Sequence, residues 1–173
     1  MAVETQRLVL QPPRLADAAT LFTFLGDPKA MQYAHADRSL RECRRRVAVH
    51  EWCRRRNGCA PWTIQEKTDS RIIGWGGLYV DPFDTGWGQE VGYFFHPSAW
   101  GRGYASELVA ACVRIADEDQ LLDVRAFAHP ENAGSQRVLE KNGFEKVRLV
   151  PRMRRFLYRR RCGSVPPASP PAP

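Results

Sequence analysis

The segment 90–107 carries the residues whose types and order are the most informative about chemistry. It reads Glu-Val-Gly-Tyr-Phe-Phe-His-Pro-Ser-Ala-Trp-Gly-Arg-Gly-Tyr-Ala-Ser-Glu, so a strand-like run enters a glycine-bearing loop that opens a helix. The first N–H groups of a helix have no intrahelical partners and carry the positive end of its dipole. Gly101 and Gly103 have no side chain to keep a phosphate away, and Arg102 adds a positive charge. These features predict a pyrophosphate site, although two glycines before a helix can also be only a flexible helix start.

A second segment, 129–144, follows about thirty residues later and reads His-Pro-Glu-Asn-Ala-Gly-Ser-Gln-Arg-Val-Leu-Glu-Lys-Asn-Gly-Phe. The two segments together closely resemble the GCN5-related N-acetyltransferase (GNAT) superfamily. They are most similar to its branch of ribosomal-protein N-terminal acetyltransferases and their relatives. In that branch Glu-(Ile/Val)-Gly-Tyr leads to Trp-Gly-x-Gly-Tyr-Ala, and Asn-x-x-Ser precedes a helix ending in Glu-Lys-x-Gly-Phe. The order of elements fits the family from about Thr5 to Tyr158.

The resemblance implies an α/β (α+β) fold, with a mixed, mostly antiparallel sheet and helices on both faces. Its two central parallel strands, expected over 90–95 and 124–128, would splay into a V that holds acetyl-CoA. The first strand would pair with the pantetheine amides, one of its N–H groups would polarise the thioester carbonyl, and the loop would hold the pyrophosphate. The implied cofactor contacts are Tyr93, Phe94, Phe95, Trp100, Gly101, Arg102, Gly103, Tyr104, Ala105, Ser106 and Asn132.

Two side chains are implied to act in acetyl transfer. Most alkylamines are protonated near pH 7, so a base is needed before the amine can attack. Glu90, at the substrate end of the splayed strand, is the expected base, acting through water. Its alternative role is that of an ordinary carboxylate that contacts substrate or solvent. Ser135 matches the serine proposed to protonate the leaving thiolate, and otherwise it faces solvent or bonds locally.

One position departs from the wider superfamily. Many members carry a tyrosine as general acid five residues before the Phe of Gly-Phe, and here that position is Leu139. The acid is therefore Ser135, a water or a different side chain.

Asn132 is also a preferred helix N-cap, a role compatible with a cofactor contact. Cys112 falls on a predicted buried helical stripe, so direct attack in a ternary complex is expected instead of a cysteine nucleophile.

The elements that must position these residues follow from hydrophobic period and from capping signals. Strands are predicted over 5–10, 62–67, 71–80, 90–95, 124–128, 144–150 and 153–158, and helices over 15–25, 39–56, 103–117 and 132–142. Three glycines inside one strand, Gly74, Gly76 and Gly77, indicate a bulge, close approach of a ligand to the backbone, or tight packing. A single domain is expected over 1–162, followed by a disordered Pro-, Ala- and Ser-rich tail over 163–173.

Composition limits the class of protein. A chain of 173 residues with 43% hydrophobic and 26% charged residues can bury a core, and it is neither collagen-like nor a coiled coil. Its apolar stretches are far shorter than the roughly 20 residues of a membrane span, and the N-terminus has no apolar signal core, so a cytoplasmic protein is expected. Five cysteines without a CxxC pair and four separated histidines predict reduced thiols and no metal site.

The implied function is transfer of the acetyl group of acetyl-CoA to a primary amine, on either a protein N-terminus or a small molecule. A non-catalytic acyl-CoA-binding regulator on the same fold is one alternative. A nucleic-acid-binding protein is another, because the net charge is +7 and arginines cluster in the helix over 39–56, where they could contact ribosomal RNA or form a solvated face. These arginines argue mildly against a strongly cationic acceptor, since like charges repel. A monomer or a homodimer is expected.

Overall fold

The computed structural model describes residues 2–162, which form one eight-stranded sheet and the helices packed on it. In spatial order the strands are β1 (Val3–Glu4), β2 (Leu8–Gln11), β3 (Trp62–Glu66), β4 (Ile72–Val80), β5 (Gln89–Phe95), β6 (Asp123–Ala128), β8 (Arg155–Arg161) and β7 (Glu145–Val150). The α-helices are α1 (Ala18–Leu25), α2 (Leu40–Asn57), α3 (Tyr104–Glu118) and α4 (Ala133–Lys141). Short 3₁₀ turns lie at Leu15–Asp17, Thr85–Trp87, Pro97–Ala99 and Pro151–Met153.

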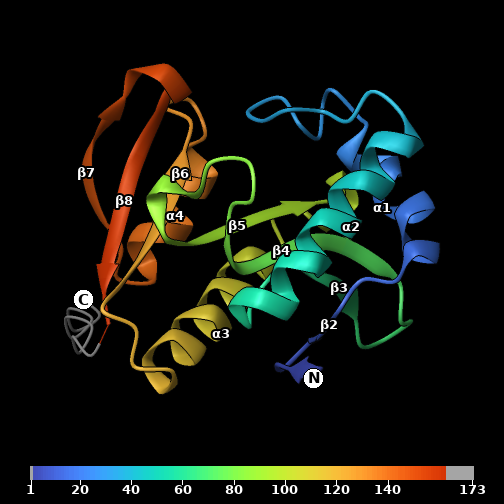
Figure 1. Ribbon diagram of the computed structural model, residues 1–173, viewed down its shortest axis with the longest axis horizontal. Coiled ribbons are helices and arrows are strands. Elements are labelled where there is room, and N and C mark those ends of the chain that lie inside the picture. The colour runs from blue at the N-terminus through green and yellow to red at the C-terminus, as the bar shows by residue number, and fades with distance from the viewer. Residues whose placement is uncertain (1, 163–173) are drawn as a thin grey trace.

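One parallel strand pair divides the sheet into two arms. All other neighbouring strands are antiparallel, whereas β5 and β6 run parallel and are paired only at Glu90 with Arg125 and Val91 with Ala126. Beyond Val91 the two strands diverge, with β2–β5 in one arm and β6–β8 in the other (Figure 1). This arrangement confirms the predicted mixed sheet with a splayed central pair.

Helices cover both faces of the sheet, as predicted. α1 and α2 pack on one face around a core that includes Leu21, Phe24, Val47 and Trp75. α3 packs on the other face, and its fully buried stripe includes Leu108 and Cys112, as the helical spacing predicts. α4 packs on β6 and β7 (Figure 1). The central strands are therefore held from both sides, and the V between them is framed by packed elements.

Local signals set the ends of the helices. The Ser39 side chain accepts a hydrogen bond from the Glu42 N–H at 3.2 Å at the start of α2, and Gly58 ends that helix with a φ of 75°. At the start of α4 the Asn132 side chain accepts a bond from the Ser135 N–H. Gly103 precedes α3 with a φ of 79°. No helix within residues 2–162 is both long and apolar enough to cross a membrane.

The predicted strands were wrong in two places. The strand predicted over 5–10 is broken by a turn, because the Thr5 hydroxyl accepts a bond from the Leu8 N–H at 3.0 Å and so competes with the strand ladder. The last strand begins later than predicted, since a 3₁₀ turn ends at Arg154 in the left-handed conformation. The tail predicted over 163–173 lies outside the described residues.

The glycines of β4 are explained by packing. A Cβ at Gly74 would lie 2.7 Å from the Phe95 ring, and one at Gly76 would lie 2.5 Å from the carbonyl oxygen of Gly92. A Cβ at Gly77 would overlap the Trp62 ring. Tight packing is therefore observed at all three glycines, and the predicted bulge is present beside Gly74, where the register of the β3–β4 ladder shifts between Ile64 and Gln65.

Candidate active site

A cleft of about 660 Å³ opens where β5 and β6 diverge. Its walls come from these two strands, from the loop before α3 and from the first turns of α3 and α4. Most of the residues singled out from the sequence line it. They are Glu90, Tyr93, Phe94, Phe95, Trp100, Gly101, Gly103, Tyr104, Ala105, Ser106, Asn132 and Ser135. The fold thus gathers into one cleft the two segments whose motifs are more than thirty residues apart.

The loop before α3 leaves room for an anion. Gly101 and Gly103 have φ angles of 72° and 79°, in the left-handed region that favours glycine. A Cβ added at Gly101 would have no other atom within 4 Å, so the space beside it belongs to the cleft. The Trp100 Nε1 donates to the Phe95 carbonyl oxygen at 3.0 Å and ties the loop to the end of β5. The N-terminus of α3 therefore adjoins an open, glycine-lined space, which suits a phosphate group.

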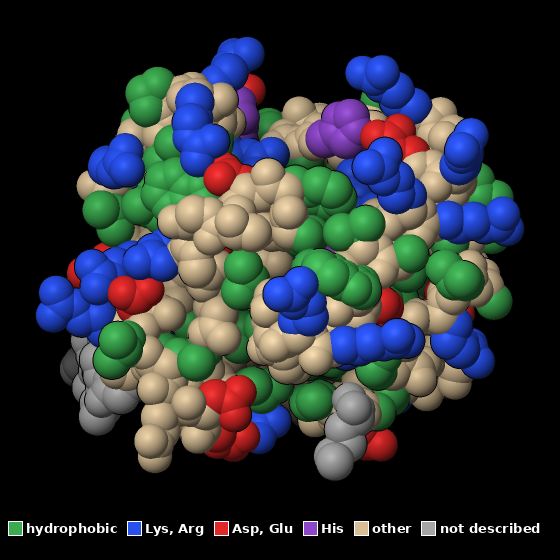
Figure 2. Space-filling view, viewed as in Figure 1, with side chains coloured by type: hydrophobic (Ala, Val, Ile, Leu, Met, Phe, Trp, Pro, Cys, Tyr) green, Lys and Arg blue, Asp and Glu red, His purple; other side chains and the backbone are tan. Residues whose placement is uncertain are grey.

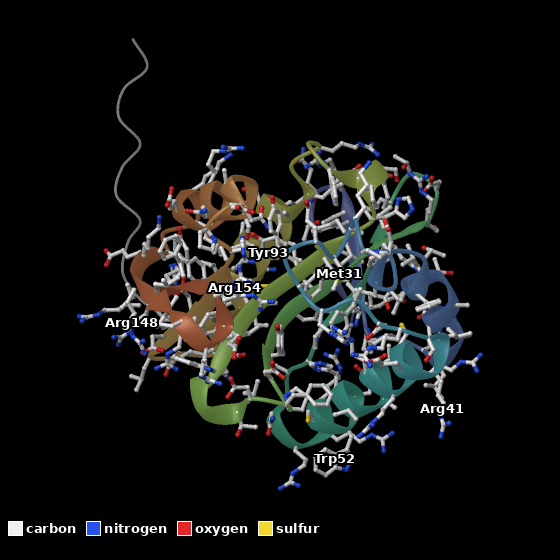
Figure 3. All side chains as sticks on the ribbon, turned by 90° about the horizontal axis from the view of Figure 1, so that it is seen from above. Met31, Arg41, Trp52, Tyr93, Arg148 and Arg154 are labelled. Carbon is white, nitrogen blue, oxygen red and sulfur yellow. The ribbon has the colours of Figure 1, made fainter. Side chains whose placement is uncertain are left out.

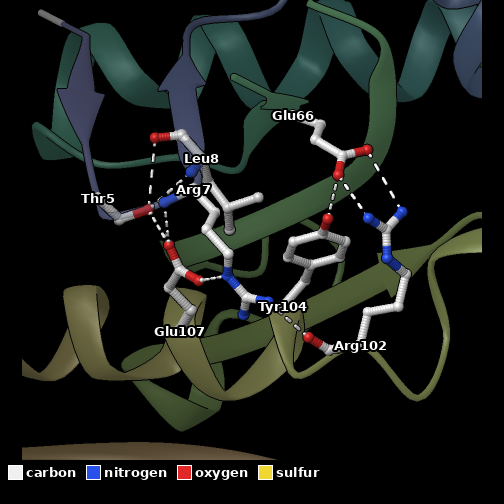
Figure 4. A network of polar contacts seen from close by, with 7 residues as sticks. All are labelled: Thr5, Arg7, Leu8, Glu66, Arg102, Tyr104 and Glu107. Atoms are coloured by element: carbon white, nitrogen blue, oxygen red, sulfur yellow. Dashed lines mark hydrogen bonds and ion pairs between the residues drawn. The ribbon is translucent and has the colours of Figure 1, made fainter. Parts of the chain in front are cut away.

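The Arg102 guanidinium does not line the cleft. It donates to the Glu66 carboxylate at 2.7 Å and lies 4.9 Å from the centre of the Tyr104 ring (Figure 4). The Tyr104 hydroxyl also donates to Glu66, and this bond, more than the one from Arg102, holds the pKa of Glu66 below its ordinary value. The charge expected beside the phosphate is thus balanced by Glu66. Arg102 is also absent from the residues that line the cleft, so its implied contact with the cofactor stays a prediction.

A second polar network secures the same loop from the N-terminal side. The Arg7 guanidinium donates to the Arg102 carbonyl oxygen at 2.8 Å and pairs with the Glu107 carboxylate at 2.7 Å (Figure 4). Glu107 also accepts a bond from the Thr5 hydroxyl at 2.6 Å. It lies in the first turn of α3, where the helix dipole stabilises a carboxylate. Contacts outside the cleft therefore hold the loop in shape.

The edge of β5 that faces the cleft is uncovered along half of its length. The ladder to β6 stops at Val91, so β6 does not cover β5 from Gly92 to Phe95. Main-chain N–H and C=O groups on such an edge can pair with another extended chain. This is the segment on which the pantetheine amides are expected, and its geometry suits an extended ligand with amide groups.

Glu90 lies at the apex of the V. It is 6% exposed, and its neighbours across the ladder are Tyr79 on β4 and Arg125 on β6. Its Oε1 has no hydrogen-bond partner among the described residues. Burial, reinforced by the carboxylates of Asp81 and Asp84, raises the pKa of Glu90 to about 8. A carboxyl group with this pKa can take up or release a proton near neutral pH.

Ser135 lies on α4 and contacts a tyrosine of β5. Its Oγ is 3.0 Å from the hydroxyl oxygen of Tyr93, and its N–H donates to the Asn132 Oδ1 at 3.0 Å. Asn132 therefore acts as the N-cap of α4 while it lines the cleft. Tyr93 was implied by the resemblance only as a contact of the cofactor. It lies near the centre of the molecule (Figure 3), and burial raises its pKa to about 12, so its hydroxyl keeps its proton at neutral pH.

Glu90 and the Tyr93–Ser135 pair lie on opposite faces of the sheet. Side chains alternate along a strand, so Glu90 shares the α1 and α2 face with Phe94, which packs against that core. Tyr93 points to the face that carries α3 and α4. The opening between β5 and β6 connects the two faces. The Glu90 carboxyl, which titrates near neutral pH, therefore lies on one side of the opening, and the hydroxyl groups of Tyr93 and Ser135 lie on the other.

The remaining reactive side chains have structural roles. Cys112 is fully buried, and burial raises the pKa of its thiol to about 12, so it is not a thiolate at neutral pH. His96 Nδ1 lies 2.8 Å from the Ser98 hydroxyl oxygen. The His129 ring stacks on Tyr33 at 5.1 Å between ring centres, at the rim of the cleft. Both histidines therefore make local contacts beside the cleft.

The arginines of α2 are divided between inward and outward positions. Arg46 pairs with the buried Asp37 at 2.6 Å, and Arg54 pairs with Glu51 at 2.9 Å. Arg41 projects outward from α2 (Figure 3). On the face drawn in Figure 2, lysine and arginine side chains are dispersed among acidic and apolar ones instead of forming one patch. That face offers no continuous basic surface for a nucleic acid.

Sequence reasoning missed the groups that surround Glu90. Tyr79, Asp81 and Arg155 line the cleft beside it, and the Arg155 guanidinium also donates to the Tyr33 carbonyl oxygen at 3.1 Å. Tyr79 could have been found from the hairpin of β4 and β5, since the register places it directly opposite Glu90. Arg155 comes from β8 in the other arm, and no local pattern in the sequence marks it.

Comparisons with known proteins agree with this geometry. The acetyltransferase (GNAT) domain family matches residues 7–145. The uncharacterized protein YkkB of Bacillus subtilis (strain 168) is 30% identical over 148 residues, which cover 84% of this chain and 86% of that protein. An acetyltransferase from Agrobacterium tumefaciens str. C58 superposes with a TM-score of 0.80 at 24% identity, over 92% of this chain and 93% of its own. The ribosomal L7/L12 alpha-N-protein acetyltransferase RimL, solved in complex with coenzyme A, superposes with a TM-score of 0.76 at 16% identity, over 94% of this chain and 98% of its own.

Proposed function

Because the chain belongs to the acetyltransferase (GNAT) family and is therefore an acyltransferase, we propose that it moves the acetyl group of acetyl-CoA onto a primary amine by direct attack in a ternary complex. The acceptor is a protein N-terminus or a small-molecule amine. The observation that carries this proposal is the buried carboxyl of Glu90 at the apex of the V, whose Oε1 has no hydrogen-bond partner within residues 2–162 and whose pKa is about 8.

The cleft residues fit acetyl-CoA, which supplies the thioester when it is bound. The uncovered edge of β5 from Gly92 to Phe95 would hold the pantetheine arm through main-chain hydrogen bonds. The N–H groups at the start of α3, beside Gly101 and Gly103, would hold the pyrophosphate. Asn132 would contact the cofactor from α4. A main-chain N–H of β5 would stabilise the negative charge that develops on the thioester oxygen.

Glu90 would act as the base for the acceptor. The amine arrives as an ammonium ion, whose charge beside Glu90 favours the ionised carboxylate. Glu90 can then accept a proton, directly or through one water, and leave a neutral amine that can attack. Asp81 lines the same part of the cleft and would help to attract the ammonium.

Ser135 would serve as the acid for the departing thiolate. Its hydroxyl can donate a proton while it accepts a hydrogen bond from Tyr93, and the high pKa of Tyr93 keeps that donor protonated. The placement of Glu90 and Ser135 on opposite sides of the opening supports this division of roles, because proton removal and proton donation occur at opposite ends of the reacting bonds. The buried thiol of Cys112 supports direct attack without an acyl-cysteine.

The proposal is tested by a panel of amines and N-terminal peptides, scored by release of free CoA thiol from acetyl-CoA. Turnover with at least one acceptor, lost in Glu90→Gln, is the expected result. Acetyl-CoA binding with no thiol release across the panel would favour the non-catalytic regulator instead. Failure to bind acetyl-CoA at all would remove the cofactor assignment.

A further inference from the structure

A second cavity, of about 550 Å³, lies next to the cleft on the α1 and α2 face of the sheet. Five residues, Ala34, Tyr79, Asp81, Phe94 and Arg155, line both spaces, so the cavity continues from the Glu90 end of the cleft. Trp75 of β4 and His50 of α2 form its inner part. Trp75 lies four residues along β4 from Tyr79, which places it roughly 13 Å farther along the strand.

The inner part of this cavity is walled by aromatic rings. The His50 ring lies edge-on to Trp75 at 5.0 Å and to Tyr79 at 5.5 Å between ring centres. It also lies 6.1 Å from the Phe83 ring. Trp75 in turn stacks on Phe94 at 6.2 Å. Such walls favour a flat, apolar or aromatic body over a highly hydrated one.

Polar atoms without partners gather in the same place. Among the described residues, five buried side-chain polar atoms have no hydrogen-bond partner, and three of them, Asp37 Oδ2, His50 Nδ1 and Trp75 Nε1, belong to residues that line this cavity. A fourth is the Oε1 of Glu90, at the junction with the cleft. Buried polar atoms are nearly always satisfied, so such a group of exceptions points to hydrogen-bonding atoms supplied from outside the chain.

The charges around the cavity are balanced. Asp37 is paired with Arg46, and His50 is neutral because burial, aided by Arg46 and Arg54, lowers its pKa to about 4. The wall carries three acidic side chains and three basic ones. The acidic ones are Asp37, Glu42 and Asp81, and the basic ones are Arg45, Arg46 and Arg155. A balanced wall gives no advantage to a polycation or to a polyanion.

We propose that this cavity binds the body of the acceptor, and that the acceptor is a small monoamine whose far end is a flat ring bearing a hydrogen-bonding atom. The assignment rests on the proposed function, since the amine must reach Glu90 while the ring occupies the cavity that Trp75, His50 and Phe94 line. The ring's polar atom would satisfy the Trp75 indole N–H, the His50 nitrogen or the free oxygen of Asp37.

The discriminating substrates are pairs of amines that differ by one hydroxyl group. Phenethylamine is compared with tyramine, and tryptamine with serotonin, while spermidine and tripeptides with N-terminal Ala or Ser represent the other acceptor classes. All assays contain EDTA, so that a cation held by the nearby His35, Asp37 and Glu42 cannot contribute. We expect the hydroxylated member of at least one pair to have a kcat/KM at least about tenfold higher, because a site with buried polar groups rejects an analogue that leaves them unpaired.

The matched variants are Trp75→Phe and Trp52→Phe. Trp75→Phe keeps an aromatic ring but removes the indole N–H. The ratio of kcat/KM for the hydroxylated amine to kcat/KM for its unhydroxylated partner should therefore fall toward one. Trp52 is 55% exposed on the outer side of α2 (Figure 3), so Trp52→Phe should keep the full preference. If Trp75→Phe fails to fold, as judged by thermal melting, His50→Phe provides the same comparison.

Calorimetry of the amines with the CoA-bound protein gives a second readout that does not depend on turnover. Tighter binding of a hydroxylated ring amine, weakened in Trp75→Phe, would support the inference. Equal binding and turnover within both pairs would overturn it, and so would a clear preference for spermidine or a tripeptide. In that last case the proposed function would stand, because acetyl transfer that depends on Glu90 is measured separately.

Discussion

Burial disfavours the ionised form of the Glu90 carboxyl and raises its pKa to about 8. Its proposed role as a base can therefore be tested by measuring activity and stability as a function of pH. We predict that Glu90→Gln, which keeps the shape but cannot accept a proton, lowers kcat/KM at least about a hundredfold near pH 7. Acetyl-CoA affinity, measured by calorimetry, should be unchanged. The wild-type kcat/KM should rise with pH through about 8, since the carboxylate form increases over that range.

The loss in Glu90→Gln should shrink as pH rises, because more of the acceptor then arrives as neutral amine. If Glu90 only orients the acceptor, the loss appears mainly in the acceptor KM and persists at high pH. A Gln variant with near-normal kcat at pH 7 would remove Glu90 from the proton-transfer step.

The same carboxyl group should also make stability depend on pH. Its pKa is about 8 in the folded protein, against an ordinary value of 4.5, so between these values the folded state holds a proton that the unfolded chain has released. The free energy of unfolding that Glu90 contributes is therefore present at low pH and declines as pH rises from about 4.5 to about 8. We predict that the Tm of Glu90→Gln, relative to wild type, increases from pH 5 to pH 9. If the difference in Tm between Glu90→Gln and wild type does not change with pH, the raised pKa of Glu90 is contradicted.

The hydroxyl pair of Ser135 and Tyr93 combines a proposed chemical role with a structural one. Ser135→Ala should lower kcat by about a hundredfold if Ser135 is the acid, with the KM for acetyl-CoA nearly unchanged. It should also cost about 0.5–1.5 kcal/mol of stability, because the Tyr93 hydroxyl loses the Ser135 Oγ and keeps only its 3.5 Å bond to the Ser135 carbonyl oxygen. The double variant with Tyr93→Phe should recover most of the Tm but none of the kcat. A kcat within twofold of wild type in Ser135→Ala would assign the proton to a water.

At the scale of elements, the start of α3 is the feature whose shape matters most to the proposed function. Gly103 and Gly58 both adopt φ angles near 75–79°, but only Gly103 lines the cleft, while Gly58 ends α2. A valine at either position should cost similar stability through backbone strain. We predict that Gly103→Val weakens acetyl-CoA binding at least tenfold, about 1.4 kcal/mol, whereas Gly58→Val leaves it unchanged. If calorimetry gives Gly103→Val the same affinity for acetyl-CoA as wild type, the pyrophosphate does not bind at this loop.

The helix start is also held by a group of side chains of which only Tyr104 lines the cleft. Glu66 binds both Arg102 and Tyr104, and Glu107 binds both Thr5 and Arg7, so the loop is fixed from β3 and from the N-terminal turn. Polar contacts of this kind keep main-chain groups in position before a ligand arrives, and they reduce the ordering that binding requires. The shape of the loop thus depends partly on residues outside the two motifs, namely Thr5, Arg7 and Glu66.

At the scale of the whole molecule, the segment between α1 and α2 links the two arms across the cleft. The Tyr33 ring stacks on His129 from the β6 arm, and the Tyr33 carbonyl oxygen accepts a bond from Arg155 of β8. We predict that Tyr33→Ala raises the acceptor KM several-fold with little loss of Tm, because the stack across the rim is lost while both cores remain. Tyr33→Phe keeps the ring and should behave like wild type. An unchanged KM in Tyr33→Ala would show that this link does not shape the acceptor site.

The sequence alone determined the order of elements and the loop before α3, and the resemblance to a family added the splayed strand pair. The first two features rest on local signals, such as the glycines of the loop, the Asn132 cap and the apolar spacing around Leu108, which can be recognised without knowing the fold. The resemblance placed Glu90 and Ser135 among the candidates by motif, and their roles remain predictions.

Only the tertiary structure decided what surrounds those candidates. The raised pKa of Glu90 comes from burial and from Asp81 and Asp84, and the partner of Ser135 is Tyr93 on another element. Arg102 is a second case, since its charge is balanced by Glu66, 36 positions earlier in the chain. Burial, charge balance and unpaired polar atoms depend on which distant segments the fold brings together, and no local pattern in a chain records those distances.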